Sequence, residues 1–139
     1  MTTMIRAKIS EKNKYYIDKH RHYELKHFCL QYPSWKRAYA EFDDTSISLS
    51  TIESVPTSNI PGDPTAKRAV MKAHYSERIK LIEKIAIEAD RYLHEYILKA
   101  VTEGLSYTHL KSRLGIPCSK DMYYDRYRKF FWLLSASRK

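Results

Sequence analysis

Apolar residues recur at steps of three and four along most of the chain, the spacing that places side chains on one face of an α-helix. Over residues 15–30 this pattern forms two stripes, one with Ile17, Leu25 and Phe28 and one with Tyr16, Tyr23 and Leu30. We therefore expect a helix over residues 15–30 that is stopped by Pro33. Ser34 is a favourable cap for a short second helix, which we expect to end near Phe42.

The longest apolar stripe follows Pro64. Its members are Ala66, Ala69, Val70, Ala73, Ile79, Ile82, Ile85, Ala86 and Ala89. Asp63 directly before Pro64 is a strong start signal, because the carboxylate accepts hydrogen bonds from the first turn and proline lacks an N–H that would be unpaired there. We expect one helix over residues 64–89.

Asp90 and Gly104 delimit the next predicted helix. Asp90 is a favourable N-terminal cap, and Gly104 suits the end because it has no Cβ to oppose a left-handed turn. Between them Leu93, Ile97 and Val101 are spaced four residues apart, so we expect them to face inward.

The last part of the chain predicts two helices separated by a tight turn. Residues 105–114 form the short first helix, with Leu110 and Leu114 on one face, and Gly115 ends it. After Ile116 and Pro117, Ser119 is expected to cap a longer helix. The inward face of that helix consists of Tyr123, Tyr127, Phe130, Phe131 and Leu134. The opposite face consists of Lys120, Asp121, Tyr124, Asp125 and Arg128, flanked by Arg126 and Lys129, and we expect the Tyr124 ring to be exposed.

The segment between the predicted helices has a different composition. Residues 43–63 contain four acidic and no basic side chains, and they are rich in Ser and Thr and interrupted by Pro56, Pro61 and Gly62. We interpret them as a mobile acidic linker. The expected organisation is an N-terminal basic helical arm over residues 1–42, this linker over 43–63, and a helical core with a C-terminal helix-turn-helix over 64–139. The fold class is all-α, with five or six helices.

The charge balance indicates an anionic partner. The 139 residues include 25 basic and 16 acidic side chains, a net charge of +9. Residues 104–139 alone carry eight basic and two acidic side chains. The first ten residues lack the apolar run of a signal peptide, and no stretch approaches the ~20 apolar residues of a membrane span. We therefore expect a cytoplasmic protein, with no membrane partner.

Catalytic and metal-binding patterns are weak. His20, His22, His27 and Cys29 are a candidate metal cluster, but no CxxC or HxxxH pair supports it, and solvated histidines are the favoured interpretation. Cys118 lies near a predicted helix N-terminus, which acts to lower a thiol pKa, yet no base or oxyanion site accompanies it. We expect no enzyme activity, no cofactor and no metal.

A short helix, a tight turn and a longer helix with one apolar and one basic face predict a helix-turn-helix unit. We expect residues 119–129 to enter the major groove of duplex DNA, where arginine pairs with guanine, and the surrounding basic side chains to neutralise phosphates. Phosphate anchoring is assigned to Lys111, Arg113, Arg126 and Lys129. The full predicted DNA-binding set is Lys111, Arg113, Ser119, Lys120, Tyr124, Arg126, Arg128 and Lys129.

These residues carry a resemblance to a known family. The runs GDPTAKRAV, IEADRYL and GLSYTHLKSRLGIPCSKDMYYDRYRKFFWLL, within residues 62–136, resemble the phage late-gene transcriptional activators of the RinA and ArpU type, and KYYIDKHRHYELKHF is a weaker counterpart. The resemblance implies a C-terminal helix-turn-helix similar to the promoter-reading region of sigma factors, with residues 119–129 as recognition helix. Asp121 and Asp125 depart from a purely basic groove face; they either orient Arg128 or accept from a cytosine amine.

Several alternatives stay open at this stage. A DNA-packaging protein of the small terminase type would use the same motif to recognise DNA ends. A protein-binding inhibitor of a nucleic-acid enzyme would instead use the basic face to bind that enzyme. The stripe over residues 64–89 either covers the C-terminal unit or forms a homodimer. The N-terminal basic helix is a candidate for a second phosphate contact or for a contact with RNA polymerase.

Overall fold

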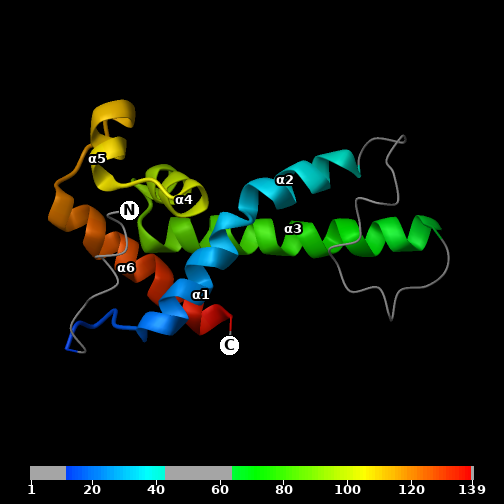
Figure 1. Cartoon of the computed structure of the whole chain (residues 1–139), viewed down its shortest axis with the longest axis horizontal. Helices are drawn as coiled ribbons and strands as arrows, with labels where there is room; N and C mark the ends of the chain where they lie inside the picture. The colour runs from blue at the N-terminus through cyan, green and yellow to red at the C-terminus, as the bar shows by residue number, and fades with distance from the viewer. Residues whose placement is uncertain (1–11, 43–63, 139) are drawn as a thin grey trace. The chain divides into compact units, whose positions relative to one another are not determined.

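The computed structural model describes residues 12–42 and 64–138, and every regular element in these two ranges is a helix (Figure 1). The elements are α1 (Lys19–Leu30), α2 (Tyr32–Glu41), α3 (Pro64–Ala89), α4 (His94–Glu103), α5 (Tyr107–His109), the π-helical segment η3 (Leu110–Leu114) and α6 (Lys120–Ser137). The predicted all-α fold class is confirmed. The predicted acidic linker over residues 43–63 lies outside the described residues.

The helices form two compact units. Among the described residues, the first contains residues 12–31 and 82–138, and the second contains residues 32–42 and 64–81. Residues 12–31 of the predicted N-terminal arm therefore pack in the same unit as the C-terminal helices. The long helix α3 contributes residues to both units.

Three helix starts differ from the sequence expectation. Asp18 has extended backbone and its carboxylate accepts from the His20 N–H at 2.9 Å, so α1 begins after Asp18 rather than at Tyr15. The helix α2 begins at Tyr32, ahead of Ser34; Pro33 lies in its first turn, where a missing N–H costs no hydrogen bond. Asp90 does cap, but its carboxylate accepts from Tyr92 and Leu93 in a turn that precedes α4.

The first unit has its core where α1, α4 and α6 pack together. The inward residues predicted for α4 and α6 are confirmed as buried, namely Leu93, Ile97, Val101, Tyr123, Tyr127, Phe130, Phe131 and Leu134. They meet Leu25, Phe28 and Cys29 of α1 and Ile82, Ile85 and Ala86 of α3, which are also buried. Each large apolar side chain removed from water contributes about 1.5–3 kcal/mol.

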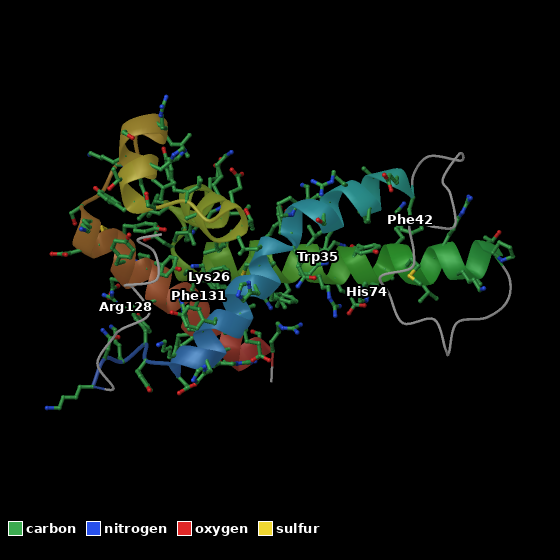
Figure 2. All side chains as sticks on the ribbon, in the orientation of Figure 1. Lys26, Trp35, Phe42, His74, Arg128 and Phe131 are labelled. Carbon is green, nitrogen blue, oxygen red and sulfur yellow. The ribbon has the colours of Figure 1, made fainter. Side chains whose placement is uncertain are left out.

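The second unit is built from α2 and the first part of α3. Tyr32, Trp35, Met71, Tyr75 and Ile79 are buried, the Phe42 and Tyr75 ring centroids lie 6.0 Å apart, and Arg78 lies over the Trp35 ring (Figure 2). The predicted stripe through Ala69, Val70 and Ala73 is wrong here, because these three residues are exposed. The face with Met71 and Tyr75 is the buried one because larger side chains remove more apolar area from water.

Candidate nucleic-acid interface

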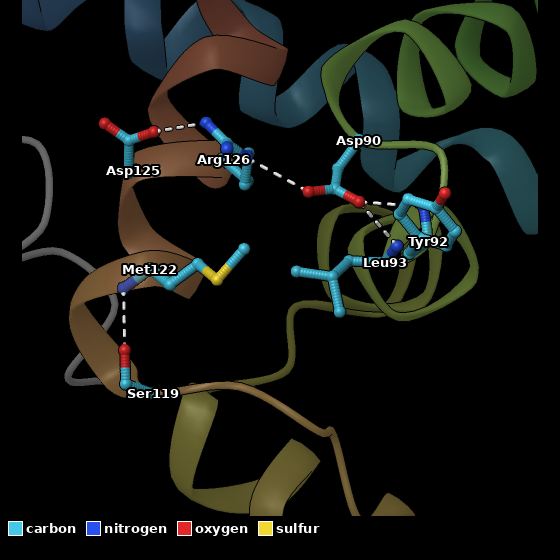
Figure 3. Close-up of polar contacts among 7 residues, drawn as sticks. All are labelled: Asp90, Tyr92, Leu93, Ser119, Met122, Asp125 and Arg126. Atoms are coloured by element: carbon cyan, nitrogen blue, oxygen red, sulfur yellow. Dashed lines mark hydrogen bonds and ion pairs between the residues drawn. The ribbon is translucent and has the colours of Figure 1, made fainter.

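The C-terminal part of the first unit consists of a short helix, a turn and a long helix, in the predicted order. Ser106 caps α5 by accepting from the His109 N–H at 3.2 Å. Gly115 ends η3 with φ of 65°, in the left-handed region that glycine adopts without a Cβ clash. Ser119 then caps α6 by accepting from the Met122 N–H at 3.2 Å (Figure 3). The predicted roles of Gly115 and Ser119 are thus confirmed.

The turn before α6 is held from two sides. Ile116 is fully buried, and its N–H donates to the Leu110 carbonyl at 3.1 Å. The Tyr107 hydroxyl donates to the Cys118 carbonyl at 2.6 Å, which ties α5 to the turn eleven residues later. These contacts fix the direction in which α6 leaves the turn.

Tyr124 is buried, whereas the sequence predicted an exposed ring. Its side chain is only 8% exposed, and its ring centroid is 4.8 Å from that of Tyr123 and 5.9 Å from that of Tyr127. The expectation of an exposed contact at Tyr124 is therefore wrong. Lys120, Tyr124 and Arg128 are spaced four residues apart, and this spacing assigned Tyr124 to the polar face. A ring at the edge of an aromatic cluster is stabilised more by packing into the cluster than by facing water.

Arg126 is engaged within the protein. Its Nε donates to the Asp90 Oδ2 at 3.0 Å and its Nη1 to the Asp125 Oδ2 at 2.7 Å, so the guanidinium connects α6 with the turn between α3 and α4 (Figure 3). Burial alone would raise the Asp90 pKa, but the N–H groups of Leu93 and Tyr92 and the Arg126 guanidinium outweigh burial, and the pKa is lowered. Asp125 thus orients Arg126, whereas the sequence suggested Arg128 as its partner.

Sequence reasoning missed Asp90 as part of this site. It lies 36 residues before Arg126, and its only signal in the sequence was that of a helix cap. No local spacing connects the two residues, since their contact depends on how α4 and α6 pack.

Other predicted site residues are more accessible. Lys111, Arg113 and Lys120 are exposed, and Arg128 and Lys129 are half-buried. Within residues 12–42 and 64–138, none of these five side chains forms an ion pair, and the buried Nε of Arg128 has no hydrogen-bond acceptor. Lys111 and Arg113 lie in η3 before the turn that leads into α6, and Lys120 is the first residue of α6 after it.

The histidine and cysteine candidates are dispersed. His20 and His27 are exposed, whereas His22 is buried with its ring centroid 4.7 Å from that of Phe131. Among the described residues, no group of three or more His, Cys, Asp or Glu side chains is placed to hold a metal ion. Burial and the nearby Asp90 carboxylate raise the Cys118 pKa, so the expected lowering of that pKa is wrong.

Comparisons with protein-family models, curated proteins and solved structures found no match to this chain. Within the part of the chain that the structure describes, no helix has both the length and the apolar character to cross a membrane. The resemblance to the phage late-gene activators accordingly stays a prediction from sequence.

Proposed function

We propose that this chain is a sequence-specific DNA-binding transcriptional regulator, of the phage or prophage late-gene type, that uses residues 107–137 as a helix-turn-helix. The observation that carries the proposal is the group of exposed cations at the turn before α6, namely Lys111, Arg113 and Lys120, which have no ion-pair partner among the described residues. Unpaired cations beside a capped helix suit phosphates on the edge of a DNA groove.

The two faces of α6 have different roles in this mechanism. The aromatic face anchors the helix in the first unit, and the N-terminal half of the other face enters the major groove. Arg128 has no acceptor among the described residues and is assigned to a base edge, for which guanine offers two acceptors. Asp121 is exposed and is assigned to a cytosine amine. Arg126 is removed from the phosphate contacts, because two carboxylates already bind it.

Selection of bound duplexes from a random pool, followed by titration of the full chain against the selected and a scrambled duplex at about 150 mM KCl, tests this function. We expect Lys120→Gln to weaken binding to both duplexes by the same factor. We expect Arg128→Ala to weaken binding to the selected duplex only, by about 1–3 kcal/mol. If no sequence is enriched and neither substitution changes affinity, the proposal is wrong.

Two separate exposed apolar side chains of α3 are assigned to self-association, about 25 Å apart along the helix axis. Val70 is 43% and Ile87 46% exposed on α3, the helix for which the sequence suggested homodimer contacts. A dimer that places two helix-turn-helix units on one duplex suits a regulator with paired half-sites. Light scattering of the full chain separates this from DNA packaging: a ring of eight or more subunits would favour a small terminase-like role instead.

A further inference from the structure

A groove with a largely apolar lining lies on the first unit, beside the turn of the helix-turn-helix. Its volume of about 580 Å³ is within the about 300–1,000 Å³ of pockets that bind drug-sized molecules. The lining comes from α4 and the turn before it and from η3 and the turn after it, namely Tyr92, Glu95, Tyr96, Leu98, Lys99, Leu114 and Pro117. Leu114 is 38% exposed there, whereas Leu110 one turn earlier is fully buried. The apolar lining is therefore accessible from solvent.

Tyr92 projects into solvent at the rim of this groove. It is 90% exposed, whereas no other large apolar side chain in residues 12–42 and 64–138 is more than 46% exposed. The backbone beneath the ring is fixed, because the Asp90 carboxylate accepts from the Tyr92 and Leu93 N–H groups at 2.8 Å each (Figure 3). Leu93 is buried, and Asp90 is itself bound to Arg126 at 3.0 Å. The turn thus presents the ring on a backbone that needs little further ordering on binding.

One charge of each sign lies beside the exposed ring. Glu95 lines the groove and Arg91 directly precedes Tyr92, and both charged side chains are exposed. Neither of them forms an ion pair within the described residues. Lys99, which also lines the groove, already binds Glu103 at 3.4 Å. One carboxylate and one guanidinium therefore remain for a partner.

These features make the face complementary to itself. A two-fold axis presents the same patch on both copies, so the patch must contain a projection, the recess that receives it and both members of any ion pair. Tyr92 is the projection and the groove is the recess, and Arg91 and Glu95 are opposite charges within five residues. A foreign peptide would need only the recess, and the exposed ring with its neighbouring guanidinium would have no role.

We infer that this face is a two-fold interface between two copies of the chain. Tyr92 of each copy enters the groove of the other, and Arg91 of each copy pairs with Glu95 of the other. The contact is separate from the one assigned to Ile87 and Val70 on α3. It does not itself need DNA, but its use in joining two helix-turn-helix units on paired half-sites rests on the proposed function.

The size of the contact determines how tightly the copies should associate. A buried tyrosine removes about 150–250 Å² from water and covers a similar area of its groove, so two insertions bury roughly 600–1,000 Å² in total. Stable protein interfaces bury about 1,200–2,000 Å². We therefore expect a weak dimer with a Kd of about 100 µM, which is mostly monomeric at about 5 µM and mostly dimeric at about 500 µM.

Sedimentation equilibrium of the full chain without DNA, between about 5 and 500 µM, tests the inference. We expect the mean mass of the wild type to rise from that of one chain toward that of two. Tyr92→Ser is expected to stay monomeric throughout, and circular dichroism checks that it remains helical. Ile87→Ser is the matched control, because Ile87 is another exposed apolar side chain of the first unit but does not line the groove, so this variant should associate like the wild type.

An exchange of charges tests how the two copies are paired. Arg91→Glu and Glu95→Arg each place like charges together across the two-fold axis, so each is expected to weaken association by about tenfold. The double variant restores opposite charges in the reverse sense and is expected to recover most of the wild-type association. A contact through α3 predicts no such recovery.

Each contrary result has a defined meaning. A wild type that stays monomeric at about 500 µM, a mean mass above two chains, unchanged association in Tyr92→Ser or no recovery in the double charge variant overturns the inference. Loss of association in Ile87→Ser alone assigns the contact to α3 and also refutes the groove. If the wild type dimerises but selects no duplex, the proposed function fails and the interface stands; if it binds a selected duplex and remains monomeric in free solution, only the interface is refuted.

Discussion

His22 makes the stability of the first unit dependent on pH. Its side chain is 7% exposed, with ring centroids of Tyr23, Tyr127 and Phe131 at 5.9, 6.1 and 4.7 Å. Burial in this aromatic surrounding, with a smaller contribution from the Lys26 charge, lowers the pKa of His22 from 6.5 to about 4 (Figure 2). The folded protein therefore holds this imidazole neutral at a pH at which the unfolded chain protonates it.

The sign and size of the effect follow from proton linkage. Between pH 4 and 6.5 the unfolded chain binds more protons at His22 than the folded protein does, so the contribution to stability is complete above pH 6.5 and is lost as the pH falls toward 4. A pKa difference of this size corresponds to about 3 kcal/mol of unfolding free energy across the window. This is a large part of the 5–15 kcal/mol that is typical of a domain.

Urea denaturation followed by circular dichroism at several pH values between 4 and 7.5 measures this dependence. The wild type is expected to lose about 3 kcal/mol more than His22→Phe over the window, because phenylalanine suits the aromatic surroundings and does not titrate. His27→Gln, an exposed histidine on the same helix, is the control and should follow the wild type. If the curves of wild type and His22→Phe run parallel across the window, the reasoning about His22 is refuted.

Four further substitutions test the packing of the first unit. Arg126→Ala and Asp90→Asn are each expected to lower the unfolding free energy by about 2 kcal/mol. The double variant is expected to lose much less than the sum of the two single losses, because the two side chains share one partly buried contact. Additive losses in urea titrations would contradict this. Arg21→Ala removes donors to the Ser135 hydroxyl and to the Ser135 and Arg138 carbonyls, so amide exchange over residues 134–138 should become faster while Arg37→Ala leaves it unchanged. Gly115→Ala should cost about 1 kcal/mol in thermal unfolding, since its φ of 65° strains any residue with a Cβ although nothing lies within 4 Å of that atom; an unchanged stability would refute the assigned turn.

The sequence predicted those features that depend on local periodicity and capping. The buried face of α6, the cap at Ser119 and the left-handed glycines at 104 and 115 all follow from the spacing of a few adjacent residues. The start of α3 at Pro64 likewise follows from its helix-start chemistry. Each of these is determined within one or two helical turns, where local interactions dominate.

Features that depend on the packing of distant helices were not predictable. The Asp90–Arg126 contact and the position of Tyr15 on Trp132 require knowledge of which helices lie together. Tyr124, Ala69 and Ala73 were misassigned because helical spacing identifies candidate faces but not which face the neighbouring elements cover. The competition between two plausible faces is decided by the total apolar area buried, which a single helix does not reveal.

The two tryptophans of the chain fall in different units. Trp35 is buried in the second unit, whereas Trp132 is 41% exposed in the first. A variant with only one of them has an intrinsic fluorophore that monitors a single unit, and the Trp132 emission should be the more red-shifted and more readily quenched by acrylamide. With Trp35 replaced by phenylalanine, the natural fluorescence of Trp132 would follow events beside α6 without any attached dye.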